Sequence, residues 1–141
     1  MASNDPPPAH ASGTSAWGVV GALLAALAVL AGAFGAHALK ASLTPVALAA
    51  FETAVRYQFF HALALIVIAG LLERPRHAAV GWAAWTLLIG IVFFSGSLYL
   101  LTLTPMRWPG PLTPLGGLCF LIGWLALAFG LWPRRSPAGR S

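Results

Sequence analysis

The sequence predicts an all-α integral membrane protein, a bundle of four transmembrane helices, from three observations. Apolar residues make up 59% of its 141 residues and charged residues only 8%, whereas a soluble domain carries about 25% charged residues. Three long stretches contain no Asp, Glu, Lys or Arg, and each is long enough to cross a hydrocarbon layer of roughly 30 Å. The basic residues stand between the apolar stretches, which is typical of membrane helices.

The chain divides into one transmembrane domain and two polar ends. Residues 1–16, which contain Pro, Gly and Ser, and the basic tail 133–141 are expected to be disordered arms. Residues 17–132 are expected to form the domain, with its four spans at 17–39, 46–72, 80–103 and 112–132.

The second span differs from the others because it carries charge. Residues 59–72 are uncharged but too few to cross the bilayer, so the span must extend back through Glu52 and Arg56. Thr44-Pro45 and Thr113-Pro114 each place a capping hydroxyl before a proline, and they predict the starts of the second and fourth helices.

The distribution of Lys and Arg predicts that both termini lie in the cytoplasm. Five basic residues fall on the side of the termini and three on the other: Arg74, Arg76, Arg134, Arg135 and Arg140 against Lys40, Arg56 and Arg107. Ala36-His37-Ala38 resembles a signal-peptide cleavage site, but a basic region does not precede the apolar run, so a cleaved signal is not favoured.

Several classes of function are disfavoured by what the sequence lacks. The net charge of +5 is not arranged as a basic face with interleaved aromatic residues, so nucleic-acid binding is not expected. Cys119 is the single cysteine and sits in an apolar run, which excludes an intramolecular disulfide. Only Glu52 among the acids falls within a span, and Ser95 and Ser97 have no neighbouring base, so an enzyme is not expected.

The informative polar residues lie together in the second span. At 100° per residue, Glu52 and Arg56 lie within about 40° of one another, while Tyr57 and His61 lie at about 140° and 180° from Glu52. Glu52 and Arg56 have the acid-first order that favours pairing on a helix. The candidate functional cluster is Glu52, Arg56, Tyr57, Gln58, His61 and, from the first span, His37.

No metal, haem or other cofactor is expected at this cluster. Paired histidines on facing helices can ligate haem in membrane bundles. If His37 ends the first span and Glu52 begins the second at the same interface, however, His61 lies about 13 Å deeper at about 1.5 Å per residue. The two rings would therefore not meet on one haem.

Small residues and tryptophans have mainly structural interpretations. Small-residue stripes in the first and last spans predict close helix packing. Most tryptophans lie near span ends and are expected to be interface anchors. The stripe of the first span is Gly21, Ala25, Ala28, Gly32 and Ala36, and that of the last span is Gly116, Cys119, Gly123, Ala126 and Gly130. The tryptophans are Trp82, Trp85, Trp108, Trp124 and Trp132.

Four motifs resemble those of the YgdD-like family of small membrane proteins (domain of unknown function 423). They are GAFGAHALK at residues 32–40, TAVRYQ at 53–58 followed by HALAL at 61–65, FSGSLY at 94–99, and TPLGG at 113–117. The resemblance covers residues 17–131. It implies a bacterial inner-membrane location, four spans and no established activity.

The preferred hypothesis is an accessory or structural membrane protein whose polar helix face, from Glu52 to His61, holds the bundle together or docks a partner. The rival hypothesis is a small transporter or channel for protons, ions or a small solute that uses the same face. The expected partners are the lipid bilayer and either another membrane protein or a second copy of the chain.

Overall fold

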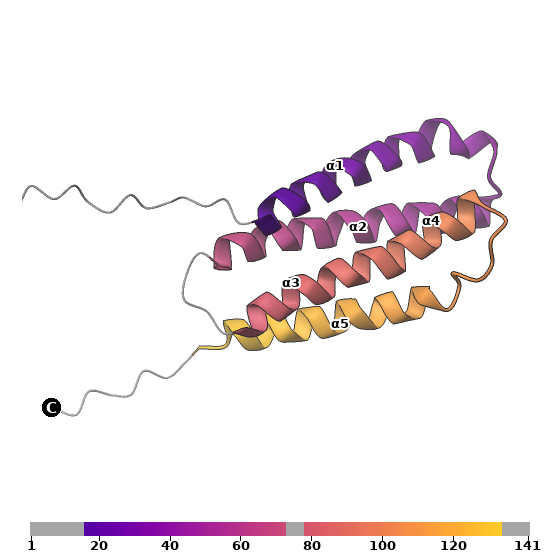
Figure 1. The fold of residues 1–141 in the computed structure, drawn as a ribbon. Coiled ribbons are helices and arrows are strands. Elements are labelled where there is room, and N and C mark those ends of the chain that lie inside the picture. Colours follow the sequence, from indigo (N-terminus) through magenta and orange to yellow (C-terminus); the bar gives the residue numbers. More distant parts are fainter. Residues whose placement is uncertain (1–15, 73–77, 134–141) are drawn as a thin grey trace, which may run out of the picture.

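The computed structural model describes residues 16–72 and 78–133 and confirms the all-α membrane fold. Four helical spans, Ala16–Ala41, Pro45–Leu72, Ala78–Leu103 and Leu112–Leu131, are long and apolar enough to cross a bilayer. They run alternately up and down, so that the start of the first and the end of the last lie at the same end of the molecule (Figure 1). The predicted disordered arms fall outside the described residues, apart from Ala16 and Pro133 at their edges.

The first two spans are joined by a short turn. Helix α1 (Ala16–His37) is followed by one 3-10 turn, η1 (Leu39–Ala41), and then by α2 (Pro45–Leu72). The Thr44 hydroxyl accepts a hydrogen bond of 3.3 Å from the backbone N–H of Ala47, and the proline stands after it at the first helical position. The predicted start of the second helix is therefore confirmed.

The third span contains an irregularity that the sequence did not predict. Helix α3 (Ala78–Gly90) passes through a π-helical segment, η2 (Ile91–Ser95), into α4 (Gly96–Leu103). A π-helical turn widens the backbone and rotates the next stretch of helix relative to a regular α-helix. This segment therefore sets which residues of α4 face the neighbouring helices.

Helix α5 (Leu112–Leu131) does not begin with the predicted cap. Its N-cap residue is Pro111, and no side chain caps it. The Thr113 hydroxyl instead lies 2.7 Å from the hydroxyl of Ser97 on α4. The prediction of a Thr113 cap is thus wrong, because a cross-helix partner inside the protein takes the hydroxyl that would have capped the helix.

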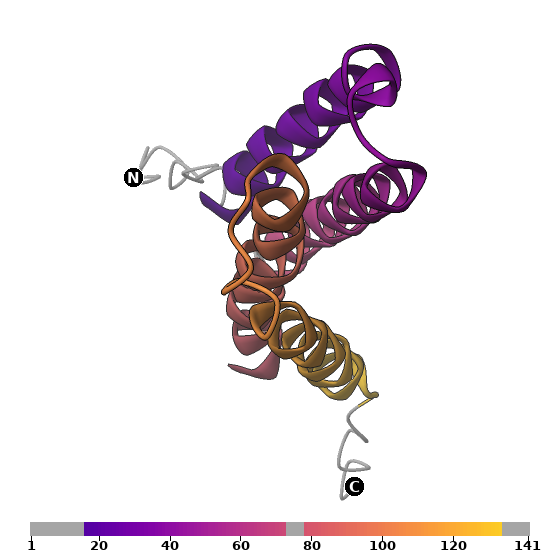
Figure 2. The same cartoon turned by 90° about the vertical axis from the view of Figure 1, so that its right-hand side faces the viewer.

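The helices pack in an open order in which α2 and α3 are central. Helix α1 packs on α2, the α3 to α4 span packs on α2, and α5 packs on α3 and η2. Figure 2 shows α1 and α5 at opposite sides of the molecule. The four largest fully buried side chains accordingly come from α2 and α3: Leu65, Ile68, Val80 and Leu87.

Large apolar side chains cover the outside of the helices. Leu30 is 67% exposed and Trp82 69% exposed, and similar residues occur on every span. A water-soluble monomer rarely presents so much contiguous apolar surface. The surface is that of a protein surrounded by lipid.

Glycines allow the helix backbones to approach closely, as small residues do in membrane bundles. A methyl group on Gly21 would lie 2.7 Å from the carbonyl oxygen of Ala62, and one on Gly123 would lie 2.6 Å from the Leu87 side chain. The predicted stripe on the first span is corrected at its end, because Gly35 is buried against Phe51 while Ala36 is exposed. In the predicted stripe on the last span, Cys119 is only partly buried, and the neighbouring Phe120 is buried instead.

We expect Gly116→Ala to destabilise the fold and Gly117→Ala to have little effect. The added methyl at Gly116 would come within 2.8 Å of the Phe94 Cα, whereas at Gly117 the nearest atom is 3.8 Å away. Overpacking of this kind costs about 1–3 kcal/mol. The free energy of unfolding in mixed micelles, titrated with SDS, measures the difference between these neighbouring variants. Equal stability would show that η2 and α5 approach one another less closely than these distances indicate.

Candidate functional site

The polar residues of α2 fall on two opposite faces of the helix. Gln58 and His61 are buried, each with 6% of its surface exposed. Glu52 and Arg56 are exposed on the other side, and Tyr57, which is also exposed, lies next to His61 at about 140° from Glu52. The predicted cluster therefore consists of an inward group and an outward group rather than one continuous polar site.

Gln58 joins three helices through its side-chain amide. Its Nε2 donates a hydrogen bond of 2.8 Å to the Leu24 carbonyl oxygen on α1, and its Oε1 accepts one of 3.0 Å from the Tyr99 hydroxyl on α4. Gln58 lies midway between Pro45 and Leu72, the ends of α2. A polar side chain at that depth has no water to bond, so the two interhelical bonds stabilise both the side chain and the packing.

His61 is held on the same inward side by bonds at both ring nitrogens. Its Nδ1 lies 2.6 Å from the Tyr57 carbonyl oxygen, and the indole Nε1 of Trp124 donates a hydrogen bond of 3.2 Å to its Nε2. These partners assign the proton of a neutral ring to Nδ1, which donates to the carbonyl. The ring also stacks on Phe120 with 3.5 Å between centroids. With both nitrogens engaged, the ring offers no lone pair to a metal.

Tyr57 extends the aromatic layer beside His61. Its ring stacks on Phe94 with centroids 4.5 Å apart and on His61 with centroids 5.9 Å apart. Within the described residues its hydroxyl has no hydrogen-bond partner. Tyr57 therefore contributes packing to the cluster.

Glu52 and Arg56 lie on the outward face and do not form the expected pair. No ion pair joins them within the described part of the chain. Both line a cavity of about 250 Å³ between α1 and α2, and Arg56 also lines an adjoining one of about 310 Å³. We call these two cavities the α1–α2 groove, whose α1 side includes Gly32 and Ala33. The expected Glu52–Arg56 pair is therefore not present among the described residues.

His37 lies apart from the other predicted site residues. It is the last residue of α1 and is exposed. Among the described residues it has no hydrogen bond or ring contact with α2. Nor does the described chain contain a group of three or more His, Cys, Asp or Glu side chains placed to hold a metal ion.

The structure adds residues to the site that sequence reasoning missed. Tyr99 belongs to the FSGSLY motif, which the sequence analysis used only for the family resemblance, and its hydroxyl is bonded to Gln58. Trp124 was interpreted as an interface anchor, but it lies near the middle of α5, and its indole N–H is bonded to His61. That interpretation is corrected: a buried acceptor satisfies the N–H that would otherwise seek the headgroup region.

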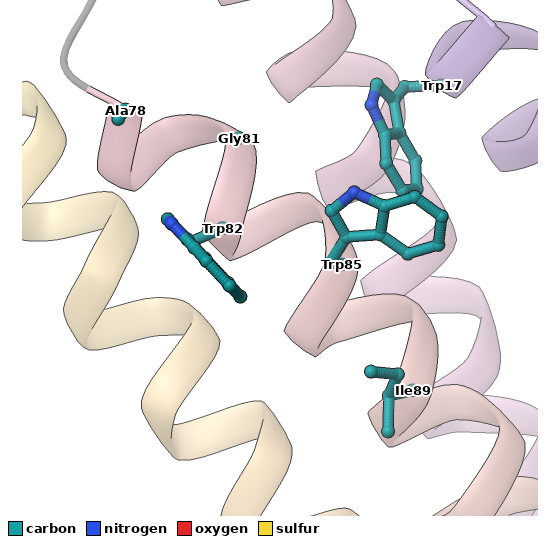
Figure 3. A pocket seen from close by; sticks show the side chains of 6 residues that line it. All are labelled: Trp17, Ala78, Gly81, Trp82, Trp85 and Ile89. Carbon is teal, nitrogen blue, oxygen red and sulfur yellow. The ribbon is translucent and has the colours of Figure 1, made fainter.

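A further cavity, of about 560 Å³, lies away from this cluster. Trp17 from α1 and Trp82 and Trp85 from α3 line it, together with Gly81 and Ile89 (Figure 3). Trp17 and Trp85 meet edge to face with centroids 4.9 Å apart. None of its lining residues is titratable. Its position at the ends of two spans and its three indoles are those of an interfacial aromatic belt.

Comparison with known proteins identifies the family. A profile described as "Protein of unknown function (DUF423)" matches residues 31–117, which include all four motifs of the sequence. The chain belongs to the DUF423 family. The resemblance noted from the sequence is thereby confirmed for domain of unknown function 423.

Membrane proteins of bacteria are among the relatives of this DUF423 chain. It is 50% identical over 109 residues to the UPF0382 membrane protein SERP0230 of Staphylococcus epidermidis, covering 77% of this chain and 88% of that protein. It is 43% identical over 110 residues to the UPF0382 membrane protein YwdK of Bacillus subtilis, covering 77% and 89%. No solved structure matches the chain. The DUF423 chain is therefore a small multi-pass membrane protein of a family without an assigned activity.

We expect Tyr99→Phe to reduce stability and Tyr57→Phe to leave it nearly unchanged. The first variant removes the hydrogen bond to Gln58, while the second removes a hydroxyl that has no partner among the described residues. Interhelical hydrogen bonds in membrane proteins contribute about 0.6–1.7 kcal/mol. Unfolding of the two variants in bicelles measures the contrast. If both lost the same stability, the Gln58–Tyr99 bond would not be what stabilises the bundle here.

Proposed function

We propose that this protein is a non-catalytic accessory or structural component of the bacterial inner membrane that docks another membrane protein segment in the α1–α2 groove. One observation carries the proposal: the polar side chains of α2 that face inward are bonded to α1, α4 and α5, whereas its charged side chains face outward. The inward group then fastens the helices, and the outward group is available to a partner.

The arrangement of the polar residues favours a role in holding the helices together over a role in proton relay. A relay needs titratable groups within hydrogen-bond reach of one another. Glu52 and His61 lie at about 180° around α2, and His61 is already bonded on both sides. Glu52 therefore has no bonded route through the core to His61.

The exposed charges support a docking role. A lone charged side chain at the centre of a transmembrane helix costs about 2.5–3.5 kcal/mol on insertion scales. Neither Glu52 nor Arg56 has an ion-pair partner within the described residues to reduce that cost. A partner segment that supplies opposite charge at the groove would reduce it.

The proposed orientation places both termini in the cytoplasm. Helix α1 begins and α5 ends at one end of the molecule (Figure 1). In the sequence, the larger group of Arg residues directly follows α2 and α5, which both end there, and the positive-inside tendency favours the cytoplasm for such an end. On this arrangement Lys40 and Arg107 lie on the outer side.

A transporter is the second candidate, and one feature favours it. The Ser95 hydroxyl is buried and has no hydrogen-bond partner within the described residues, and it ends the π-helical segment Ile91–Ser95. Such segments occur often at functional sites. A transported solute or a water file could supply the missing partner for this hydroxyl.

We expect the purified protein in liposomes to add no proton or ion flux to that of protein-free vesicles. Neither Glu52→Gln nor Ser95→Ala should alter this result, because neither side chain belongs to a bonded path across the core. A pH-sensitive dye inside the vesicles measures proton flux at an imposed potential. A flux abolished by Glu52→Gln, with protein yield unchanged, would instead establish the transporter.

A further inference from the structure

The groove belongs to a long outward face of α2. Relative to Glu52, Arg56 and Leu63 lie at about 40° and 20° around the helix, and Phe60 and Val67 at about 80° and 60°. All five side chains are exposed. The buried residues of α2 lie on the opposite side of the same helix. One face therefore carries an acid, a base and a run of large apolar side chains.

The length of α2 places the two charges on this face within the hydrocarbon layer if the helix is centred there. The 28 residues of α2 span about 42 Å, about 12 Å more than a hydrocarbon layer of roughly 30 Å. When the helix is centred in the layer, Glu52 lies about 5 Å and Arg56 about 11 Å inside the boundary near Pro45. Lipid chains offer these groups neither a counter-charge nor a hydrogen bond.

The groove is shaped for close approach by another helix. Gly32 and Ala33 are small and line it on α1 beside Val29, while Phe59 and Phe60 line it on α2. Farther along α2, a methyl group placed on Gly70 would meet nothing within 4 Å. Small residues at such positions permit helix contact in membranes.

We propose that the occupant of the groove is a second copy of this chain, in a parallel dimer whose two-fold axis runs along the membrane normal. Glu52 of each copy then pairs with Arg56 of the other. The inference rests on the proposed docking function and names its partner.

Charge complementarity and depth favour this occupant. In a two-fold contact, residue i of one copy meets residue j of the other and j meets i, so one acid and one base give two ion pairs. The two residues are one helical turn apart, an offset that resembles the staggered charge pairs of parallel coiled coils. A second copy presents both groups at matching depth in the bilayer, because the two chains insert alike.

Charge reversal tests the dimer with the full-length chain. Two copies with different affinity tags are co-expressed, and the recovery of one with the other is measured after solubilisation. We expect Glu52→Arg alone, and Arg56→Glu alone, each to lower this recovery about tenfold, because like charges then meet in both pairs. Lys40→Glu, an exposed charge reversal beyond the end of the groove, should leave recovery unchanged.

Co-expression of one copy with Glu52→Arg and one copy with Arg56→Glu, the mixed pair, is the decisive experiment. A copy with Glu52→Arg carries two arginines and a copy with Arg56→Glu carries two glutamates, so together they restore both ion pairs. We expect their mutual recovery to return to within about twofold of the original level. Recovery no better than that of either variant with itself overturns the proposed pairing.

A cross-link tests the same face with the native charges retained. In a Cys119→Ala background, Leu63→Cys places a thiol on the outward face of α2, and Leu118→Cys places one on the exposed side of α5. We expect oxidation in membranes to link copies through residue 63 at least tenfold more than through residue 118. Equal or absent linking overturns the dimer.

The two proposals fail in different ways. If the chain is monomeric in both assays while Arg56→Glu abolishes recovery of a different membrane protein, the second copy is overturned and the docking function stands. A flux dependent on Glu52 overturns the docking function itself. The dimer is supported only when the mixed pair and the residue-63 link both succeed.

Discussion

The absence of water from the hydrocarbon layer is the constraint on which this structure depends. Every polar group at that depth needs a partner from the protein, or its burial is unfavourable. Gln58 meets this requirement through Leu24 and Tyr99, and His61 through Tyr57 and Trp124. The same bonds that satisfy these side chains connect α2 to α1, α4 and α5. A central polar helix thereby organises an otherwise apolar bundle.

Close packing adds stability that hydrogen bonds alone do not supply. Lipid is as apolar as the side chains, so helices gain little from hiding leucines and must gain from contact at short range. Gly21 and Gly123 permit that contact at α1 against α2 and at α5 against α3. The outward face of α2 lacks such cover, and its charges distinguish it from the surrounding apolar surface. The division between a sealed core and a charged groove is the basis of the docking role proposed above.

The fold was largely predictable, and the site only in part. Four uncharged or nearly uncharged stretches predict four spans because crossing a bilayer needs a fixed length of apolar helix. The polar residues of α2 could be placed around a helix, but not relative to its neighbours. Trp124 and Tyr99 were therefore not linked to the site, and the Thr113 cap was predicted wrongly because its partner, Ser97, comes from another helix.

By itself, the sequence determined the solvent of this protein and its secondary structure, because both depend on local composition: too few charged residues for water, and apolar runs of membrane length. Only the tertiary structure decided which polar side chains are buried and hydrogen-bonded to other helices and which are exposed on the outside of the bundle. The π-helical segment Ile91–Ser95 rotates α4, and the order of packing turns Gln58 and His61 inward and Glu52 and Arg56 outward. Hydrogen bonds between helices depend on distances across the bundle, and no pattern along a single helix encodes those distances.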